Sequence, residues 1–212
     1  MAKLAVFDLD GTLADSLRDL ADSMNHMRGV FGLPPLDIDA ARACIGGGIR
    51  RLVALALDKA DCEREKGVAL MKSYYGEHLT DHTRLFPGMK EVLEQLRASG
   101  VILALVSNKD SRESRTILDR NGVQGYFSDL IGGDSGYALK PAPEALTVLR
   151  RKYGFSPEEC WMVGDHYTDM EAGRRAGFRR IFCSWGFGEL RGEEPEFTVD
   201  SCAGIADILL QH

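Results

Sequence analysis

Short apolar runs alternate with segments of helical periodicity along most of this chain, and this alternation is the feature that most constrains its fold. The runs are rich in β-branched or aromatic residues and lie at 4–7, 101–106, 129–131, 161–163 and 180–183. Strands that alternate with helices predict βαβ units and a parallel sheet covered by helices on both faces. We therefore expect an α/β fold with a Rossmann-like, three-layer core.

The segments between these runs repeat apolar residues at helical spacing. Residues 89–96 carry four of them at i, i+3, i+4 and i+7, which is one face of a helix. Residues 145–149 repeat this face before Gly154, and a helix around Ile117 ends at an Asn-Gly pair, a typical C-terminal cap. These helices supply the outer layers of the predicted core.

The alternation is interrupted after the first strand. No further strand pattern appears until residue 101, and most residues between show helical spacing, broken by the proline pair at 34–35. A Phe-Pro-Gly turn signal at 86–88 marks the return. We predict an all-helical cap domain inserted at residues 15–84, and a discontinuous α/β core domain formed by 1–14 and 85–212.

Polar side chains follow three of the predicted strands directly. Asp8 and Asp10 follow the first strand, and their spacing of two places both on one side of an extended segment, after which Gly11 permits a tight turn. Ser107 follows the second strand in chain order, and Asp165 follows the fourth. Each has a structural alternative: a polar turn for the first cluster, and a helix N-cap for Ser107 and Asp165.

Other polar groups lie close by in the sequence. Lys140 stands in a K-P-A-P segment before a predicted helix, where the alternative is a solvated loop lysine. Asp169 comes four residues after Asp165, so a helix would place both on one face. Asn108 and Lys109 follow Ser107, and we expect Asn108 to be the better candidate for a phosphate pocket.

The positions of these clusters favour a common site. In open α/β sheets, ligands bind beyond the carboxyl ends of the strands, where Asp8, Ser107 and Asp165 are expected. Two carboxylates 4 Å apart repel by about 4 kcal/mol at an effective dielectric constant near 20, so the cluster needs a cation. An all-oxygen ligand set favours Mg2+ over zinc. A cation, an anion site with Ser107 and Lys140, and a carboxylate nucleophile describe phosphoryl transfer.

With these residues in order, the sequence resembles the haloacid dehalogenase-like (HAD) hydrolase superfamily over essentially its whole length. The four motifs are D-L-D-G-T-L-A-D-S from Asp8, Ser107, Lys140 in K-P-x-P, and Gly-Asp from 164 through Asp169. The predicted helical insert resembles the small four-helix cap of that family. The presence of Asp10 resembles the phosphatases of the family, since haloacid dehalogenases proper lack this second aspartate.

The resemblance implies a mechanism. Asp8 would attack phosphorus and form an aspartyl-phosphate, and Asp10 would protonate the leaving oxygen and then activate water. Mg2+ would be bound by Asp8, by Asp165 and by the main-chain carbonyl of Asp10. Asp169 would bind the metal through water or position Lys140.

The resemblance also implies the phosphate contacts. Lys140 and Ser107 would neutralise and hydrogen-bond the phosphoryl oxygens. Main-chain N–H groups near Leu9 and Gly11 would assist, and Asn108 would shape the pocket.

A glycine-rich segment in the predicted cap bears on the substrate. The stretch from Ile45 to Leu52 reads I-G-G-G-I-R-R-L and precedes a helix, so its plain interpretation is a flexible loop. Its G-x-G-x-x-x-L pattern is similar to that of phosphoglycolate phosphatases. That resemblance predicts a loop over the active site, with Arg50 or Arg51 contacting a substrate carboxylate.

We therefore expect a Mg2+-dependent phosphatase acting on a small phosphorylated metabolite of the phosphoglycolate type. The alternatives within the fold are pyrophosphate, a nucleoside monophosphate or a sugar phosphate as substrate. The alternative from another class is a non-catalytic protein that binds phosphorylated metabolites, since fold does not fix function.

Composition excludes several other classes of protein. With 26 Lys+Arg against 32 Asp+Glu, the formal charge is −6 and there is no long basic run, so nucleic-acid binding is not expected. No stretch approaches the ~18 apolar residues of a membrane span. Five scattered cysteines without a C-x-x-C pair favour a reducing, cytoplasmic setting. We expect a monomer or a dimer.

Overall fold

The core of the molecule is a six-stranded sheet. A computed structural model describes residues 3–57 and 61–212, and orders the strands β5-β4-β1-β6-β7-β8 with every pairing parallel. The strands are β1 (Leu4–Phe7), β4 (Ile102–Val106), β5 (Asp129–Ile131), β6 (Cys160–Gly164), β7 (Arg179–Cys183) and β8 (Phe197–Val199). The predicted α/β class and the five predicted strands are confirmed.

The sheet register brings the polar clusters to one edge. Phe7, the last residue of β1, pairs with Leu105 of β4 on one side and with Val163 of β6 on the other. The residues that follow these three strands therefore leave the sheet side by side. This register places Asp8, Ser107 and Asp165 at the same carboxyl edge.

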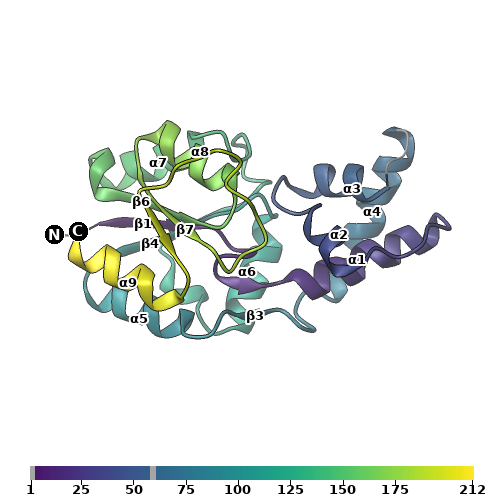
Figure 1. Cartoon of the computed structure of the whole chain (residues 1–212), viewed down its shortest axis with the longest axis horizontal. Helices are drawn as coiled ribbons and strands as arrows, with labels where there is room; N and C mark the ends of the chain where they lie inside the picture. The colour runs from purple at the N-terminus through teal and green to yellow at the C-terminus, as the bar shows by residue number, and fades with distance from the viewer. Residues whose placement is uncertain (1–2, 58–60) are drawn as a thin grey trace.

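Helices cover both faces of the sheet (Figure 1). One face packs against α5 (Met89–Ala98), α6 (Ser111–Arg120) and α9 (Cys202–Gln211), and the other against α7 (Glu144–Tyr153) and α8 (Tyr167–Ala176). Successive residues of β1 alternate between the two apolar clusters, because side chains along a strand point to opposite faces. Both faces are buried, which explains why the strands read as continuous apolar runs.

A group of helices stands apart from the sheet, on the right of Figure 1. It consists of α1 (Leu17–Val30), α2 (Ile38–Arg42), α3 (Ile49–Leu57) and α4 (Asp61–Glu77), and we call it the cap. Gly67 lets α4 approach its neighbours, since a Cβ there would lie 2.5 Å from Leu57 and 2.8 Å from Val53. The cap therefore has a packed interior, and its apolar side chains are continuous with those of one face of the core.

Two short strands join the cap to the core. β2 (Ala14–Asp15) and β3 (Arg84–Leu85) pair antiparallel, Ala14 with Leu85 and Asp15 with Arg84. Leu85 is also tied to the core, because its N–H donates to the side chain of Asn121 at 3.2 Å. The chain thus leaves the core and returns to it through one paired connection.

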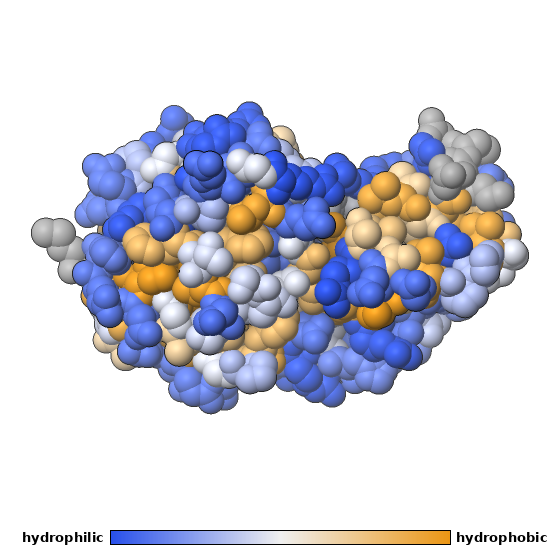
Figure 2. Space-filling view, in the orientation of Figure 1, coloured by the Kyte–Doolittle hydropathy of each residue, from blue (hydrophilic) through white to orange (hydrophobic). Residues whose placement is uncertain are grey.

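The sequence prediction missed these two strands, and also β8. Each has only two or three residues, so no periodicity distinguishes it from a loop. On the visible face, polar side chains surround the rim of the core, while apolar side chains gather in the middle of the core and on parts of the cap (Figure 2). Among the described helices, none combines the length and the apolar character needed to cross a membrane.

Candidate active site

A cleft opens at the carboxyl edge of the sheet, between the core and the cap, and encloses about 770 Å3 including its open mouth. Core residues on its wall include Asp8, Asp10, Ser107, Lys140 and Asp165. The cap contributes mostly apolar residues, namely Leu20, Ile45, Ile49, Leu52, Met71 and Tyr75. The floor of the cleft is therefore charged and its roof is apolar.

Lys140 is the central cation of the floor. Its ammonium group lies 2.8 Å from Asp8 Oδ1 and 2.7 Å from Asp169 Oδ1, and it donates to the carbonyl of Val106 at 2.6 Å. Burial opposes the charge of this lysine, but Asp169 and Asp8 outweigh it and raise the pKa of Lys140. Lys140 therefore remains charged and fixes the carboxylate of Asp8.

Asn108 holds the backbone around this lysine. Its Oδ1 accepts the N–H of Lys140 at 2.8 Å, and its Nδ2 donates to the carbonyl of Lys140 at 3.0 Å. The same amide donates to the carbonyl of Gly46, in the glycine segment of the cap, at 3.1 Å. One side chain thus links the Lys140 loop to the cap.

Asp165 is held on both carboxylate oxygens. Thr12 Oγ1 donates to Oδ1 at 2.9 Å, and the N–H groups of Phe187 and Gly188 donate to Oδ2 at 2.7 and 3.2 Å. Gly11 allows this approach, because its φ is +83° and a Cβ there would lie 2.3 Å from Asp165 Oδ2. The carboxylate of Asp165 consequently has one fixed orientation beside Asp8.

The acidic residues fit a divalent cation. One oxygen each of Asp8, Asp165 and Asp169 lies within 4.8 Å of the others. Burial, with Asp169 and Asp8 nearby, raises the pKa of Asp165 to about 8, and burial also raises the pKa of Asp169. Lys140 is the one cation among the described residues in contact with this group, so the carboxylates lack sufficient positive charge. A hard, oxygen-binding ion such as Mg2+ would supply it.

Asp10 has its own pair of partners. Ser16 Oγ donates to Asp10 Oδ1 at 2.5 Å, and the ammonium of Lys109 lies 3.1 Å from Oδ2. Lys109 also donates to the hydroxyl of Tyr75, on helix α4 of the cap, at 2.5 Å. Burial opposes the charge of Lys109, but Asp10 and Tyr75 outweigh it and raise its pKa. Asp10 is thus positioned from both the core and the cap.

His166 forms the N-cap of α8 and faces the cap. The N–H of Thr168 donates to Nδ1 at 3.3 Å, and the Thr168 hydroxyl lies 2.9 Å from the same atom. Burial lowers the pKa of His166 to about 4, so the imidazole is neutral and carries its proton on Nε2. Gly46 lies against Nε2, where a Cβ would come within 2.6 Å.

Most of the residues expected from the sequence meet in this cleft. Its wall includes Asp8, Asp10, Ser107, Asn108, Lys140 and Asp165, with Asp169 buried behind Lys140. Ser107 is not a helix cap, since α6 begins at Ser111 with Asp110 as its N-cap. Leu9 is fully buried directly after Asp8.

Two expected residues have other surroundings. Arg50 lies outside the cleft wall, and its largely exposed guanidinium pairs with Glu65 of the cap. The N–H of Gly11 already donates to the carbonyl of Ala14 at 2.9 Å, so it is occupied within its own turn. Gly11 therefore matters through the space that it leaves for Asp165.

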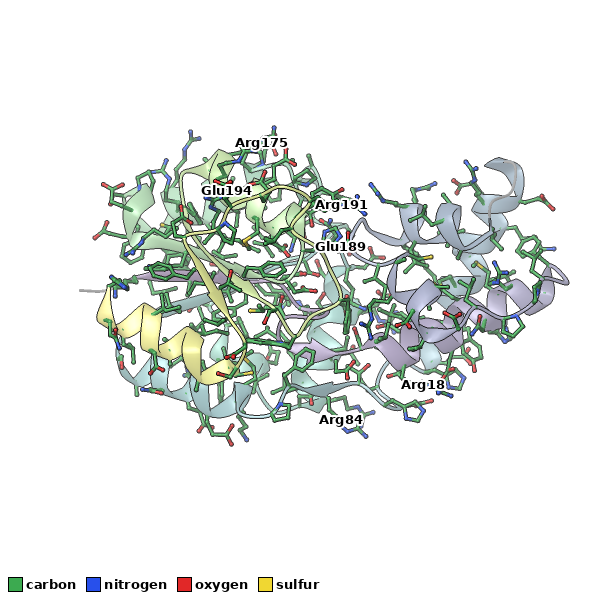
Figure 3. All side chains as sticks on the ribbon, in the orientation of Figure 1. Arg18, Arg84, Arg175, Glu189, Arg191 and Glu194 are labelled. Carbon is green, nitrogen blue, oxygen red and sulfur yellow. The ribbon has the colours of Figure 1, made fainter. Side chains whose placement is uncertain are left out.

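Sequence reasoning misses several groups at the site or gives them too little weight. It favours Asn108 over Lys109, although the position of Lys109 directly after Ser107 is a usable signal. Thr12 stands within the first motif but receives no role. Tyr75 and the Phe187 amide carry no sequence signal, because they come from distant segments. Figure 3 shows Glu189 and Arg191, in the loop that carries Phe187, at the end of the core that faces the cap.

The comparisons with known proteins agree on one family. The family model of the haloacid dehalogenase-like hydrolases matches residues 5–183. A protein named phosphoglycolate phosphatase from Haemophilus influenzae is 37% identical to this chain, and the match covers 98% of each chain. A protein of the same name from Chromobacterium violaceum is 36% identical, and the match covers 98% of this chain and 96% of that protein. A crystal structure described as a predicted phosphoglycolate phosphatase from Haemophilus somnus superposes with a TM-score of 0.93 at 34% identity, with 97% of each chain covered. The chain belongs to the haloacid dehalogenase-like hydrolase family.

Proposed function

We propose that the protein is a Mg2+-dependent phosphatase that hydrolyses a small phosphomonoester through an aspartyl-phosphate on Asp8. One observation supports this most directly: Lys140 lies 2.8 Å from Asp8, and oxygens of Asp165 and Asp169 lie within 4.8 Å of Asp8. A nucleophilic carboxylate between a fixed ammonium group and an acidic cation site suits attack on a phosphoryl group.

The acidic residues would hold the ion. The carboxylates of Asp8 and Asp165 and the main-chain carbonyl of Asp10 are the proposed ligands of Mg2+, which would neutralise charge on the phosphoryl oxygens. Asp169 contributes through Lys140, whose ammonium it holds at 2.7 Å, and accepts the N–H of His166 at 3.1 Å. In this proposal Asp169 is a positioning residue for Lys140.

The phosphoryl group would be bound by donors around Asp8. Lys140 and Ser107 are the proposed side-chain donors, with the main-chain N–H of Leu9 beside them and Asn108 holding the Lys140 loop. Ser107 is 5% exposed and lines the cleft, so it is accessible only from inside. These contacts orient phosphorus toward the free oxygen of Asp8.

Asp10 is the proposed acid and base. Attack by Asp8 forms the phosphorus–oxygen bond of the aspartyl-phosphate and breaks the bond to the leaving oxygen, to which Asp10 gives its proton. Asp10 then takes a proton from the water that cleaves the intermediate and releases phosphate. The cap, which we propose comprises residues 15–84, keeps other water away from this step.

Phosphoglycolate is the substrate we propose first, because two relatives at 36% and 37% identity bear that name over nearly their full length. Release of inorganic phosphate from a panel that includes pyrophosphate, a nucleoside monophosphate and a sugar phosphate tests this choice.

The nucleophile is tested by Asp8→Asn. We expect kcat for p-nitrophenyl phosphate to fall at least about 1000-fold, with an unchanged circular dichroism spectrum, because an amide cannot form the intermediate. Asp39→Asn is the matched control, since Asp39 is an exposed residue of α2 in the cap, and should leave kcat unchanged.

The metal is tested with the same substrate. EDTA should stop phosphate release by the unaltered protein, and added Mg2+ should restore it. Near-normal turnover by Asp8→Asn would exclude Asp8 as nucleophile, and activity insensitive to EDTA would exclude the cation.

A further inference from the structure

The two lysines of the cleft differ in their free hydrogen-bonding capacity. Lys140 has three acceptors for its three N–H groups, from Asp8, Asp169 and Val106. Lys109 contacts Asp10 Oδ2 at 3.1 Å and the Tyr75 hydroxyl at 2.5 Å, and within the described residues no third acceptor takes its ammonium. Lys109 therefore keeps one donor for a ligand.

Lys109 stands where the leaving group of a substrate would lie. With phosphorus at Asp8 and the leaving oxygen at Asp10, the atoms beyond that oxygen pass Lys109, because its ammonium touches Asp10. Its side chain is 5% exposed yet lines the cleft. A charge-assisted hydrogen bond at such a site is stronger than one in bulk water.

The surroundings limit the size of the group that Lys109 would meet. Tyr75 closes the space on one side, with its ring 4.3 Å from the ammonium. Leu52 and Met71 of the cap add apolar wall. The single free donor of Lys109, beside Asp10, suits an acidic group close to the ester oxygen, whereas Arg50 is turned toward Glu65 and lies outside the cleft wall.

We propose that Lys109 is the specificity-determining residue of this site, and that it binds the carboxylate of a short, acidic leaving group. This inference rests on the proposed phosphatase function. It assigns to Lys109 of the core the contact that the sequence assigned to an arginine of the cap.

Glu113, a second charged residue of the cleft, would favour a leaving group of the opposite charge, and this difference can be tested. It lines the cleft on the first turn of α6, close enough to Lys109 and Asp10 to interact with both charges. If Glu113 contacted the leaving group, the site would select a cationic one. If Lys109 contacts the leaving group, the site selects an anionic one. Glu113→Gln should therefore raise kcat/KM for an acidic ester, since it removes a negative charge beside Lys109.

Three nearly isosteric esters separate these cases. Phosphoglycolate ends in a carboxylate, 2-hydroxyethyl phosphate in a neutral hydroxyl, and phosphoethanolamine in an ammonium group. We expect the unaltered protein to prefer phosphoglycolate in kcat/KM. In Lys109→Met, the ratio of kcat/KM for phosphoglycolate to that for 2-hydroxyethyl phosphate should fall about 10- to 100-fold, the value of one hydrogen bond between charged groups.

The ratio isolates recognition from damage to Asp10, which lowers both rates together. Tyr75→Phe, which removes one anchor of the lysine, should lower the same ratio by a smaller factor. Lys152→Met is the matched control, because Lys152 is an exposed lysine of α7 that pairs with Asp129 of the outer strand β5, outside the cleft wall, and should leave the ratio unchanged.

The outcomes distinguish this proposal from the function on which it rests. If no ester is hydrolysed by the unaltered protein, the phosphatase function itself fails. If the unaltered protein hydrolyses the esters without preferring the acid, or Lys109→Met keeps the preference, the assignment of Lys109 is wrong. Loss of the preference in Arg50→Met or in Arg51→Met would assign the carboxylate contact to an arginine of the cap and would overturn the assignment of Lys109.

Discussion

The side-chain amide of Asn108, at the carboxyl end of β4, donates a hydrogen bond of 3.1 Å to the carbonyl of Gly46 in the cap. The same side chain makes two hydrogen bonds to the backbone of Lys140. The two residues that follow Asn108 also contact the cap, Lys109 through Tyr75 and Asp110 through Lys72 at 2.6 Å. The loop after β4 therefore lines the candidate active site and also makes polar contacts that hold the cap against the core.

Asn108→Ala should weaken both connections. We expect KM for a small phosphomonoester to rise about tenfold, because the Lys140 loop and the cap lose a shared anchor, and the free energy of unfolding to fall by about 1 to 3 kcal/mol. Asn121→Ala is a matched control, since Asn121 also makes two hydrogen bonds to main-chain atoms but lies beside β3. In Asn121→Ala the free energy of unfolding should fall by a similar amount while KM stays constant. A KM that rises equally in both variants would refute a specific role for Asn108.

Gly46→Ala should disturb the contact between the glycine segment of the cap and His166. Gly46 has a φ of +107°, and a Cβ there would lie 2.6 Å from His166 Nε2. We expect kcat/KM to fall at least about tenfold from strain and displacement of this loop. The double variant Gly46→Ala, His166→Ala should recover part of that loss, because the clash is gone while the backbone strain remains.

A second glycine of the cap serves as the control for this substitution. Gly76 lies on α4 without a positive φ, and a Cβ added there would have no atom within 4 Å outside its own helix backbone. Gly76→Ala should leave kcat/KM unchanged and raise the free energy of unfolding by up to about 1 kcal/mol. Full activity of Gly46→Ala would show that the loop does not depend on contact with His166.

In the metal-free protein, the contribution of Asp165 to the free energy of unfolding should fall as pH rises from about 4 to about 8. The pKa of Asp165 is raised from 3.8 to about 8, so in this window the unfolded chain has lost the proton that the folded protein keeps. The slope from this group is at most about 1.4 kcal/mol per pH unit. Thermal unfolding in EDTA of the unaltered protein and of Asp165→Asn measures this contribution as the difference between the two, because neutral His166 changes stability in the opposite direction below pH 6.5.

Added Mg2+ should reduce this decline, because a bound cation stabilises the ionised carboxylate. Asp165→Asn should reduce the decline of stability with pH even without metal, since the amide does not titrate. A pH profile that is identical with and without Mg2+ would contradict the assignment of Asp165 to the cation site.

The sequence by itself determined the layered α/β fold and the positions of the acidic residues. Apolar periodicity is a local property, so it located five strands of the sheet and the helix of residues 89–96. Residues that follow neighbouring parallel strands must emerge at one edge, so the order of the motifs along the chain is enough to predict that Asp8, Ser107 and Asp165 meet.

Only the tertiary structure decided the partners of these residues. Arg50 turns toward Glu65, Lys109 joins Asp10 to Tyr75, and the Phe187 amide reaches Asp165. Each contact depends on how the cap and the distant loop lie relative to the sheet, and apolar packing over the whole chain sets that placement. Periodicity and motif spacing describe neighbours along the chain, whereas the recognition of a substrate depends on neighbours in space.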